Sequence, residues 1–167
     1  MADRDAAPAE RLALELKDGF VRFWSTLHEA TYRVTDGKIL NRVLGMRVVE
    51  LTTTGRRTGE PRPTMLTAPI VEAEKIVLVA SNGGDSRDPQ WFRNVLACPE
   101  VTVTLDRLTR TMRARVAEDP ERSDLWFRIR RITPTYELYQ NRTSRQLPVV
   151  VLEPLPTDPG SGGGTSA

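Results

Sequence analysis

The sequence predicts a mainly β domain of the α+β class, a small antiparallel barrel with helices around it. Six segments have the apolar–polar alternation or the β-branched content of strands, and most of them are linked as hairpins. A parallel doubly wound sheet needs a helix after nearly every strand, and this chain lacks one at most of those positions. A chain of 167 residues is long enough for one domain with a real core.

We expect a single domain over residues 9–155. Residues 1–8 are polar and alanine-rich, and residues 156–167 include the run "TDPGSGGGTSA". Neither end has apolar side chains to bury, so both are expected to be disordered. Strands are predicted at 46–53, 62–71, 75–81, 100–106, 109–118 and 147–154. Helices are predicted at 9–33, 88–97, 120–132 and 133–143, the second of them with Asp88 as its N-cap.

The predicted helix at 9–33 has one apolar face, formed by Leu12, Leu16, Phe20, Phe23 and Leu27. Such a face either packs on the core or touches a membrane surface or an apolar substrate. No apolar run is long enough to span a bilayer, and the N-terminus has no signal-peptide core, so we expect a cytoplasmic protein. The second interpretation of the helix would place it at the inner face of the cell membrane.

Charge and cysteine content limit the kinds of site. With 24 Lys+Arg against 22 Asp+Glu the formal net charge is +2, so any anion site must be local. The single cysteine, Cys98, rules out an internal disulfide and argues against a cysteine-based metal site. The one histidine, His28, lies inside the predicted first helix, where we expect a structural or exposed role. We predict no metal.

The stretch "TTTGRRTGEPR" at 52–62 joins two predicted strands and carries Arg56, Arg57 and Arg62. Arginine matches a phosphate or carboxylate with two parallel hydrogen bonds. The turn is therefore either a cradle for an anionic group or a solvated hairpin with incidental charge. It is neither a P-loop nor a dinucleotide-binding glycine motif.

Two further stretches carry candidate side chains. In "ASNGGDSRDPQW" at 80–91, a strand ends at Ser81 and passes through a glycine loop into a helix, a natural place for an anion or a polar ring edge. Tyr136 and Tyr139 are three residues apart on a predicted helix and share a face, where a phenol can stack on a ring and donate a proton. The plain alternatives are an ordinary strand–helix connection and two half-buried aromatic side chains.

Together, three stretches resemble the deazaflavin-dependent nitroreductase family of actinobacteria, whose members use coenzyme F(420). They are "LTTTGRRTGEPR", "ASNGGDSRDPQWFRNVLACPEVTV" and "PTYELYQNRTSRQLPVVVLEP", and the resemblance covers roughly residues 45–154. It implies a split β-barrel related to flavin mononucleotide-binding proteins, with an N-terminal helix and peripheral helices. It also implies a bound deazaflavin with a phosphate and an oligoglutamate tail.

The family pattern assigns roles to residues of this chain. The arginines of the turn would contact the phosphate and the tail. The cofactor residues implied are Thr53, Thr54, Arg56, Arg57, Arg62, Met65, Ser81, Asn82, Gly83, Trp91 and Asn94. The catalytic candidates, which would stabilise or protonate the product, are Tyr136, Ser81 and Tyr139.

The chain departs from the family pattern at two positions. Asn82 stands where the family often has lysine, so one positive contact is lost or is supplied by Arg87. Thr133 stands where the best-known member has tyrosine, which alters the substrate wall. Activity on bicyclic nitroimidazoles is therefore not implied.

The implied reaction is hydride transfer from reduced coenzyme F(420) to a quinone, a nitro compound or an activated double bond. The alternatives are an enzyme that uses flavin mononucleotide (FMN) and a non-catalytic protein that binds or carries the deazaflavin. A homodimer and a peripheral membrane contact through the first helix are left open. Nucleic-acid binding is disfavoured, because aromatic residues make up 6% of the chain and the charge is nearly balanced.

Overall fold

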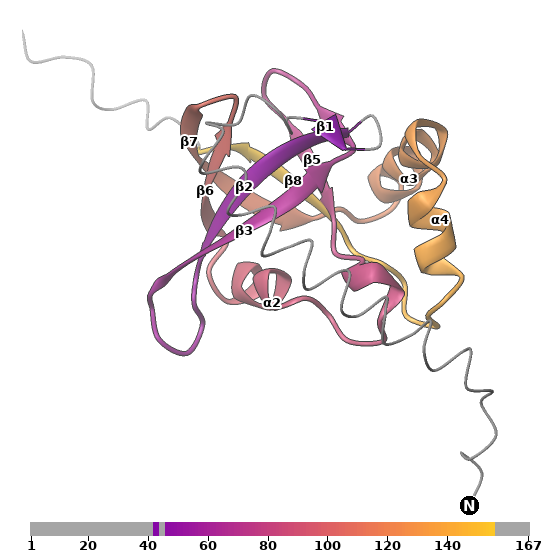
Figure 1. The fold of residues 1–167 in the computed structure, drawn as a ribbon, viewed down its shortest axis with the longest axis horizontal. Helices are drawn as coiled ribbons and strands as arrows, with labels where there is room; N and C mark the ends of the chain where they lie inside the picture. The colour runs from indigo at the N-terminus through magenta and orange to yellow at the C-terminus, as the bar shows by residue number, and fades with distance from the viewer. Residues whose placement is uncertain (1–41, 44–45, 156–167) are drawn as a thin grey trace, which may run out of the picture. The chain divides into compact units, whose positions relative to one another are not determined.

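The computed structural model describes residues 42–43 and 46–155. The predicted helix at 9–33 and both predicted disordered ends lie outside these residues, so the domain limits stay predictions. In chain order the elements are β1 (Arg42–Val43), β2 (Met46–Thr54), β3 (Pro61–Ala68), β4 (Ile70–Val71), β5 (Ile76–Val79), the 3-10 helix η1 (Asn82–Gly84), α2 (Gln90–Ala97), β6 (Glu100–Leu105), β7 (Leu108–Val116), α3 (Glu121–Ile132), α4 (Thr135–Gln140) and β8 (Val149–Pro154) (Figure 1).

The strands of the described residues form one eight-stranded antiparallel sheet. Its order is β1-β2-β6-β7-β8-β5-β4, and β3 pairs with the opposite edge of β2 from β6. The β2–β3 hairpin is the longest ladder, and its register places Thr53 opposite Arg62. The prediction of a mainly β, antiparallel fold is confirmed.

Two apolar clusters cover the two faces of β5 and β8. Leu78 and Leu152 belong to a cluster that includes the buried face of α2, whereas Val77 and Val151 belong to a cluster that includes α3 and α4. All four side chains are almost fully buried. Strands buried on both faces need continuous apolar runs, which the chain supplies as "IVLV" and "VVVL".

The predicted strands and helices within the described residues differ from the observed ones at one or both ends. For example, the strand predicted at 75–81 is Ile76–Val79, and the helix predicted at 133–143 is Thr135–Gln140. Two of the differences have a clear physical reason. The strand predicted at 62–71 breaks at Pro69, which has no N–H to donate to the ladder, and becomes β3 and β4. The helix predicted to start with Asp88 as N-cap begins at Gln90, after Pro89, and no side chain caps it. The assignment of Asp88 as N-cap is wrong, because its carboxylate accepts a hydrogen bond from Arg145 instead.

Candidate functional site

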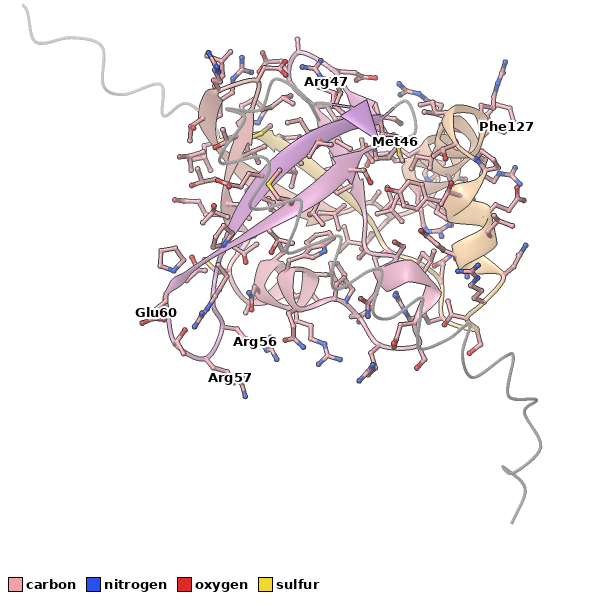
Figure 2. All side chains as sticks on the ribbon, viewed as in Figure 1. Met46, Arg47, Arg56, Arg57, Glu60 and Phe127 are labelled. Atoms are coloured by element: carbon pink, nitrogen blue, oxygen red, sulfur yellow. The ribbon has the colours of Figure 1, made fainter. Side chains whose placement is uncertain are left out.

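A tight turn at the tip of the β2–β3 hairpin carries the predicted Arg56 and Arg57 (Figure 2), and the predicted Arg62 follows it in β3. The Gly55 N–H donates to the Glu60 carbonyl over 2.8 Å, and the Gly59 N–H donates to the Gly55 carbonyl over 2.7 Å. Gly59 has a φ of +72°, in the region that favours glycine. These bonds close the turn, so Arg57 lies at its tip, whereas the Arg56 guanidinium is directed at side chains of α2.

Asn94 of α2 fixes this turn through side-chain hydrogen bonds. Its side chain is buried, with 5% exposure. The Asn94 Nδ2 donates to Thr53 Oγ1 over 3.1 Å, and its Oδ1 accepts from both the backbone N–H and the Nη1 of Arg56, each over 3.3 Å. The same Nη1 donates to Gln90 Oε1 over 2.9 Å. The Arg56 guanidinium is therefore oriented before any ligand binds.

Arg57 and Arg62 leave positive charge accessible at the turn. Arg62 Nη2 donates to Thr58 Oγ1 over 3.3 Å and to Glu60 Oε2 over 3.1 Å, and all of these side chains are exposed. Arg57 is exposed and forms no hydrogen bond or ion pair within the described residues. Three arginines and one glutamate leave the turn two positive charges in excess. An anionic ligand that approached from solvent would find three guanidinium groups on one hairpin.

The loop after β5 has a left-handed backbone over three successive residues. The φ angles are +48° at Asn82, +66° at Gly83 and +87° at Gly84. The Asn82 side chain donates to the Arg87 carbonyl over 3.1 Å. Arg87 donates through Nε and Nη2 to the Asp85 carboxylate, and these bonds lower the pKa of Asp85 to about 2. Arg87 is one of two alternatives for the lysine position, the other being that the positive contact is lost, and in the structure it is paired with Asp85.

Arg145 holds the same loop, and it is not among the site residues predicted from the sequence. Its Nε donates to the Asp85 carbonyl over 2.9 Å, its Nη1 to Asp88 Oδ1 over 3.0 Å, and its Nη2 to the carbonyls of Ala80 and Ser81, each over 3.0 Å. Three of these four acceptors are backbone carbonyls. Backbone carbonyls carry no sequence signature, and Arg145 lies outside any periodic segment, so no pattern in the chain marks this role.

The two predicted tyrosines lie together on α4. Their ring centroids are 6.1 Å apart, with an edge-on angle of 78°. The Tyr136 hydroxyl forms a hydrogen bond of 3.0 Å with Thr67 Oγ1 of β3. Burial raises the pKa of Tyr136 to about 12. Tyr139 is half-buried, and the Arg142 guanidinium lies 5.6 Å from the centre of its ring.

The remaining predicted residues divide between the core and the surface. Trp91 is 6% exposed and packs edge-on against Phe92, so it belongs to the core cluster beneath the sheet. Thr54, Met65 and Ser81 are half-buried: Thr54 ends β2, Met65 lies in the middle of β3, and Ser81 follows the end of β5. The structure thus brings Thr53, Arg56 and Asn94 into direct contact through the network above. It places the tyrosines on a separate element.

Two statements about metal ions and membrane-crossing helices apply only to the part of the chain that the structure describes. No three His, Cys, Asp or Glu side chains of these residues are grouped so that they could hold a metal ion. No helix of the same residues is long and apolar enough to cross a membrane.

Known proteins similar to this chain agree with one another. The family described as F420H(2)-dependent quinone reductase matches residues 24–154. An F420H(2)-dependent quinone reductase of Mycobacterium tuberculosis strain H37Rv is 39% identical over 130 residues, which make up 75% of this chain and 87% of that protein. A putative reductase of the same description from Mycobacterium bovis has the same identity and coverage.

Two solved structures have a similar fold at substantial identity. The F420-H2 dependent reductase FDR-A superposes with a TM-score of 0.58 at 36% identity, over 64% of this chain and 93% of that one. A domain-swapped dimer superposes with a TM-score of 0.60 at 35% identity, over 76% of this chain and 96% of that one.

Proposed function

Because the chain belongs to the F420H(2)-dependent quinone reductase family, we propose that it is an oxidoreductase that uses reduced coenzyme F(420) to reduce a quinone. The observation that carries this proposal is the arginine turn fixed by Asn94. A phosphate and an oligoglutamate tail are both anionic, and the turn offers Arg56, Arg57 and Arg62 to them. The donor set therefore fits the anionic part of the coenzyme.

The chain's own residues have separable tasks in this proposal. The bound reduced deazaflavin supplies a hydride. Arg56 is pre-oriented by Asn94 and Gln90, so little side-chain freedom is lost when it contacts an anion. Thr53, Thr54 and Met65 would lie along the coenzyme beside the turn. Ser81, Asn82 and Gly83 would lie near its ring.

Tyr136, Ser81 and Tyr139 are the proposed partners of the acceptor oxygen. A quinone that accepts a hydride gains negative charge on oxygen, which a hydroxyl hydrogen can stabilise. The phenol of Tyr136 is protonated at neutral pH, as that of any tyrosine is, and burial moves its pKa still further from neutrality, to about 12. It can therefore act as a hydrogen-bond donor. Its bond to Thr67 fixes the orientation of the ring.

The barrel, the oligomeric state and further acceptors belong to the same proposal. We infer that the sheet closes as a split barrel, which the antiparallel order around β2 and the likeness to FDR-A support. A homodimer is supported by the solved dimer with 35% identity. Nitro compounds are proposed as further acceptors, and the predicted helix at 9–33 is proposed as a contact with the membrane or with a lipophilic quinone.

A fluorescence titration tests the cofactor assignment. The protein is titrated with oxidised coenzyme F(420) and, separately, with FMN. We expect saturable binding of the deazaflavin and much weaker binding of FMN. Preferential binding of FMN would transfer the assignment to the flavin enzymes. Tight binding of the deazaflavin without turnover of any quinone or nitro acceptor would identify a carrier.

A further inference from the structure

We propose that Arg145 is a positioning residue that joins the loop after β5 to α4, and so sets the coenzyme ring against the substrate wall. This inference rests on the proposed function, because it assigns the ring to the loop and the acceptor to α4. Arg145 touches neither of them directly in this proposal. It acts through the backbone that carries Ser81 and through the helix that carries Tyr139.

The side chain of Arg145 is well enclosed, with 17% exposure. All three guanidinium nitrogens donate, and their four acceptors lie on a segment 57 to 65 residues earlier in the chain. The acceptors span Ala80 to Asp88, which is the whole connection from β5 towards α2. One side chain therefore fixes both ends of that loop.

The backbone of Arg145 is itself tied to α4. The Gln140 Nε2 donates to the Arg145 carbonyl over 2.8 Å, and the Gln140 Oε1 accepts from the Leu147 N–H over 2.9 Å. Gln140 is the last residue of α4. A continuous path of hydrogen bonds thus runs from α4 through Gln140 and Arg145 to the loop.

A close backbone approach supports the same connection. A Cβ added to Gly84 would lie 2.8 Å from the Tyr139 carbonyl oxygen and 2.9 Å from Arg142 Cβ. The loop and the end of α4 are therefore in contact at a point where only glycine fits. Contact and hydrogen bonds together make the loop and α4 one unit.

The geometry requires arginine and not merely a positive charge. A guanidinium offers five N–H donors in a fixed planar fork, whereas a lysine offers one nitrogen on a flexible stem. One ammonium nitrogen cannot reach four acceptors spread from Ala80 to Asp88. Loss of the side chain would leave three loop carbonyls and the Asp88 carboxylate without this partner. A displacement of about 1 Å between reacting groups can reduce a rate by about 10²-fold.

The test uses Arg145→Ala, with Arg115→Ala as the matched control. Arg115 also makes several charged hydrogen bonds. It lies on β7 and donates to the carboxylates of Glu121 on α3 and Glu153 on β8, not to the carbonyls of residues 80–88. Hydrogen–deuterium exchange of the coenzyme-free protein reports loop opening independently of activity. We expect amides of residues 80–88 to exchange at least about tenfold faster in Arg145→Ala than in the wild type or Arg115→Ala, with β6 and β7 unchanged.

The kinetic arm separates binding from positioning. In Arg145→Ala we expect coenzyme affinity within about threefold of wild type and hydride transfer slowed by at least about tenfold, because the arginine turn still binds the anionic part. Unchanged exchange at 80–88 would overturn the proposal, and so would faster exchange with wild-type hydride transfer. If Arg145→Ala does not fold, Asp88→Asn takes its place and must show the same changes at smaller size. A wild type that does not oxidise reduced coenzyme F(420) would defeat the proposed function, while the exchange result would still decide whether Arg145 holds the loop.

Discussion

At the scale of single residues, the buried amide of Asn94 decides how the arginine turn is presented. Its Nδ2 donates to Thr53, near the end of β2, and its Oδ1 accepts from the Arg56 guanidinium. One side chain therefore fixes a strand end and a guanidinium together. The arginine-rich stretch was visible in the sequence because three arginines and two glycines are local. Asn94 was assigned from the family pattern. No sequence pattern predicts the role of Arg145, since its hydrogen-bond partners are distant in sequence and are mostly backbone carbonyls.

The arginine turn is predicted to dominate coenzyme affinity. Arg56→Ala or Arg62→Ala should weaken binding of coenzyme F(420) by about 1–3 kcal/mol, the usual size for a charge-assisted hydrogen bond. The double variant should stay folded. Both arginine side chains are exposed, the Arg62–Glu60 pair contributes little to stability, and the backbone N–H of residue 56 still donates to Asn94 Oδ1. Arg128 lies on α3 and forms a comparable exposed pair with Glu72, so Arg128→Ala should leave the affinity unchanged. If the folded double variant binds coenzyme F(420) as tightly as Arg128→Ala does, the site assignment is refuted.

Tyr136→Phe tests the role of a single hydroxyl. We expect hydride transfer to a quinone to fall by at least about tenfold with little change in coenzyme affinity, since the phenol matters most as charge develops. Loss of the bond to Thr67 should also lower the free energy of unfolding by about 0.5–1.5 kcal/mol. Thr67→Val removes the same bond and keeps the phenol, so it is the control. If stopped-flow rates in the two variants are equal, Tyr136 is a wall residue only.

At the scale of elements, local patterns predict those strands and helices whose apolar residues recur at a regular spacing. The segments of β6 and β7 alternate and predict a hairpin. The antiparallel pairing from Glu100 opposite Arg113 to Leu105 opposite Leu108 confirms it. The ends of elements depended on distant groups. Asp88 has the residue type of an N-cap, yet Arg145 from the far end of the chain takes its carboxylate. Such competition cannot be seen in a local window.

Gly84→Ala should damage the junction between the loop and α4. The new Cβ would meet backbone and side-chain atoms under 3.0 Å away, at a φ of +87°. Gly59→Ala is the matched control, because Gly59 also has a positive φ but open space around it. The left-handed backbone alone costs about 1–2 kcal/mol, so Gly59→Ala should lose about that much and Gly84→Ala clearly more. Urea unfolding measures both, and equal losses would contradict the close contact.

At the scale of the whole molecule, ion pairs give the fold a modest dependence on pH. Hydrogen bonds from Arg115 lower the pKa values of Glu121 and Glu153, which join β7, α3 and β8. A carboxyl group with a lowered folded pKa stabilises the fold above its unfolded pKa of about 4.5, and this contribution is lost as the pH falls through the folded pKa.

We therefore expect the free energy of unfolding to fall as the pH is lowered below about 4.5. Because these side chains are partly exposed, each pair should contribute only about 0.2–1 kcal/mol. Arg115→Ala should flatten this part of the pH profile, whereas Arg128→Ala should leave the contribution of Glu121 and Glu153 in place. Urea denaturation across the acid range measures the difference, and a parallel profile in Arg115→Ala would contradict the assignment.

The most direct test of the central claim is oxidation of reduced coenzyme F(420) by a quinone in the presence of the protein. The measurement is made without oxygen, by following the absorbance of the oxidised deazaflavin as it forms. We predict oxidation that requires both the protein and the quinone, that saturates with each substrate, and that is strongly reduced in the Arg56→Ala/Arg62→Ala double variant at limiting coenzyme. Protein-dependent oxidation of reduced FMN under the same conditions, with none of the deazaflavin, would contradict it.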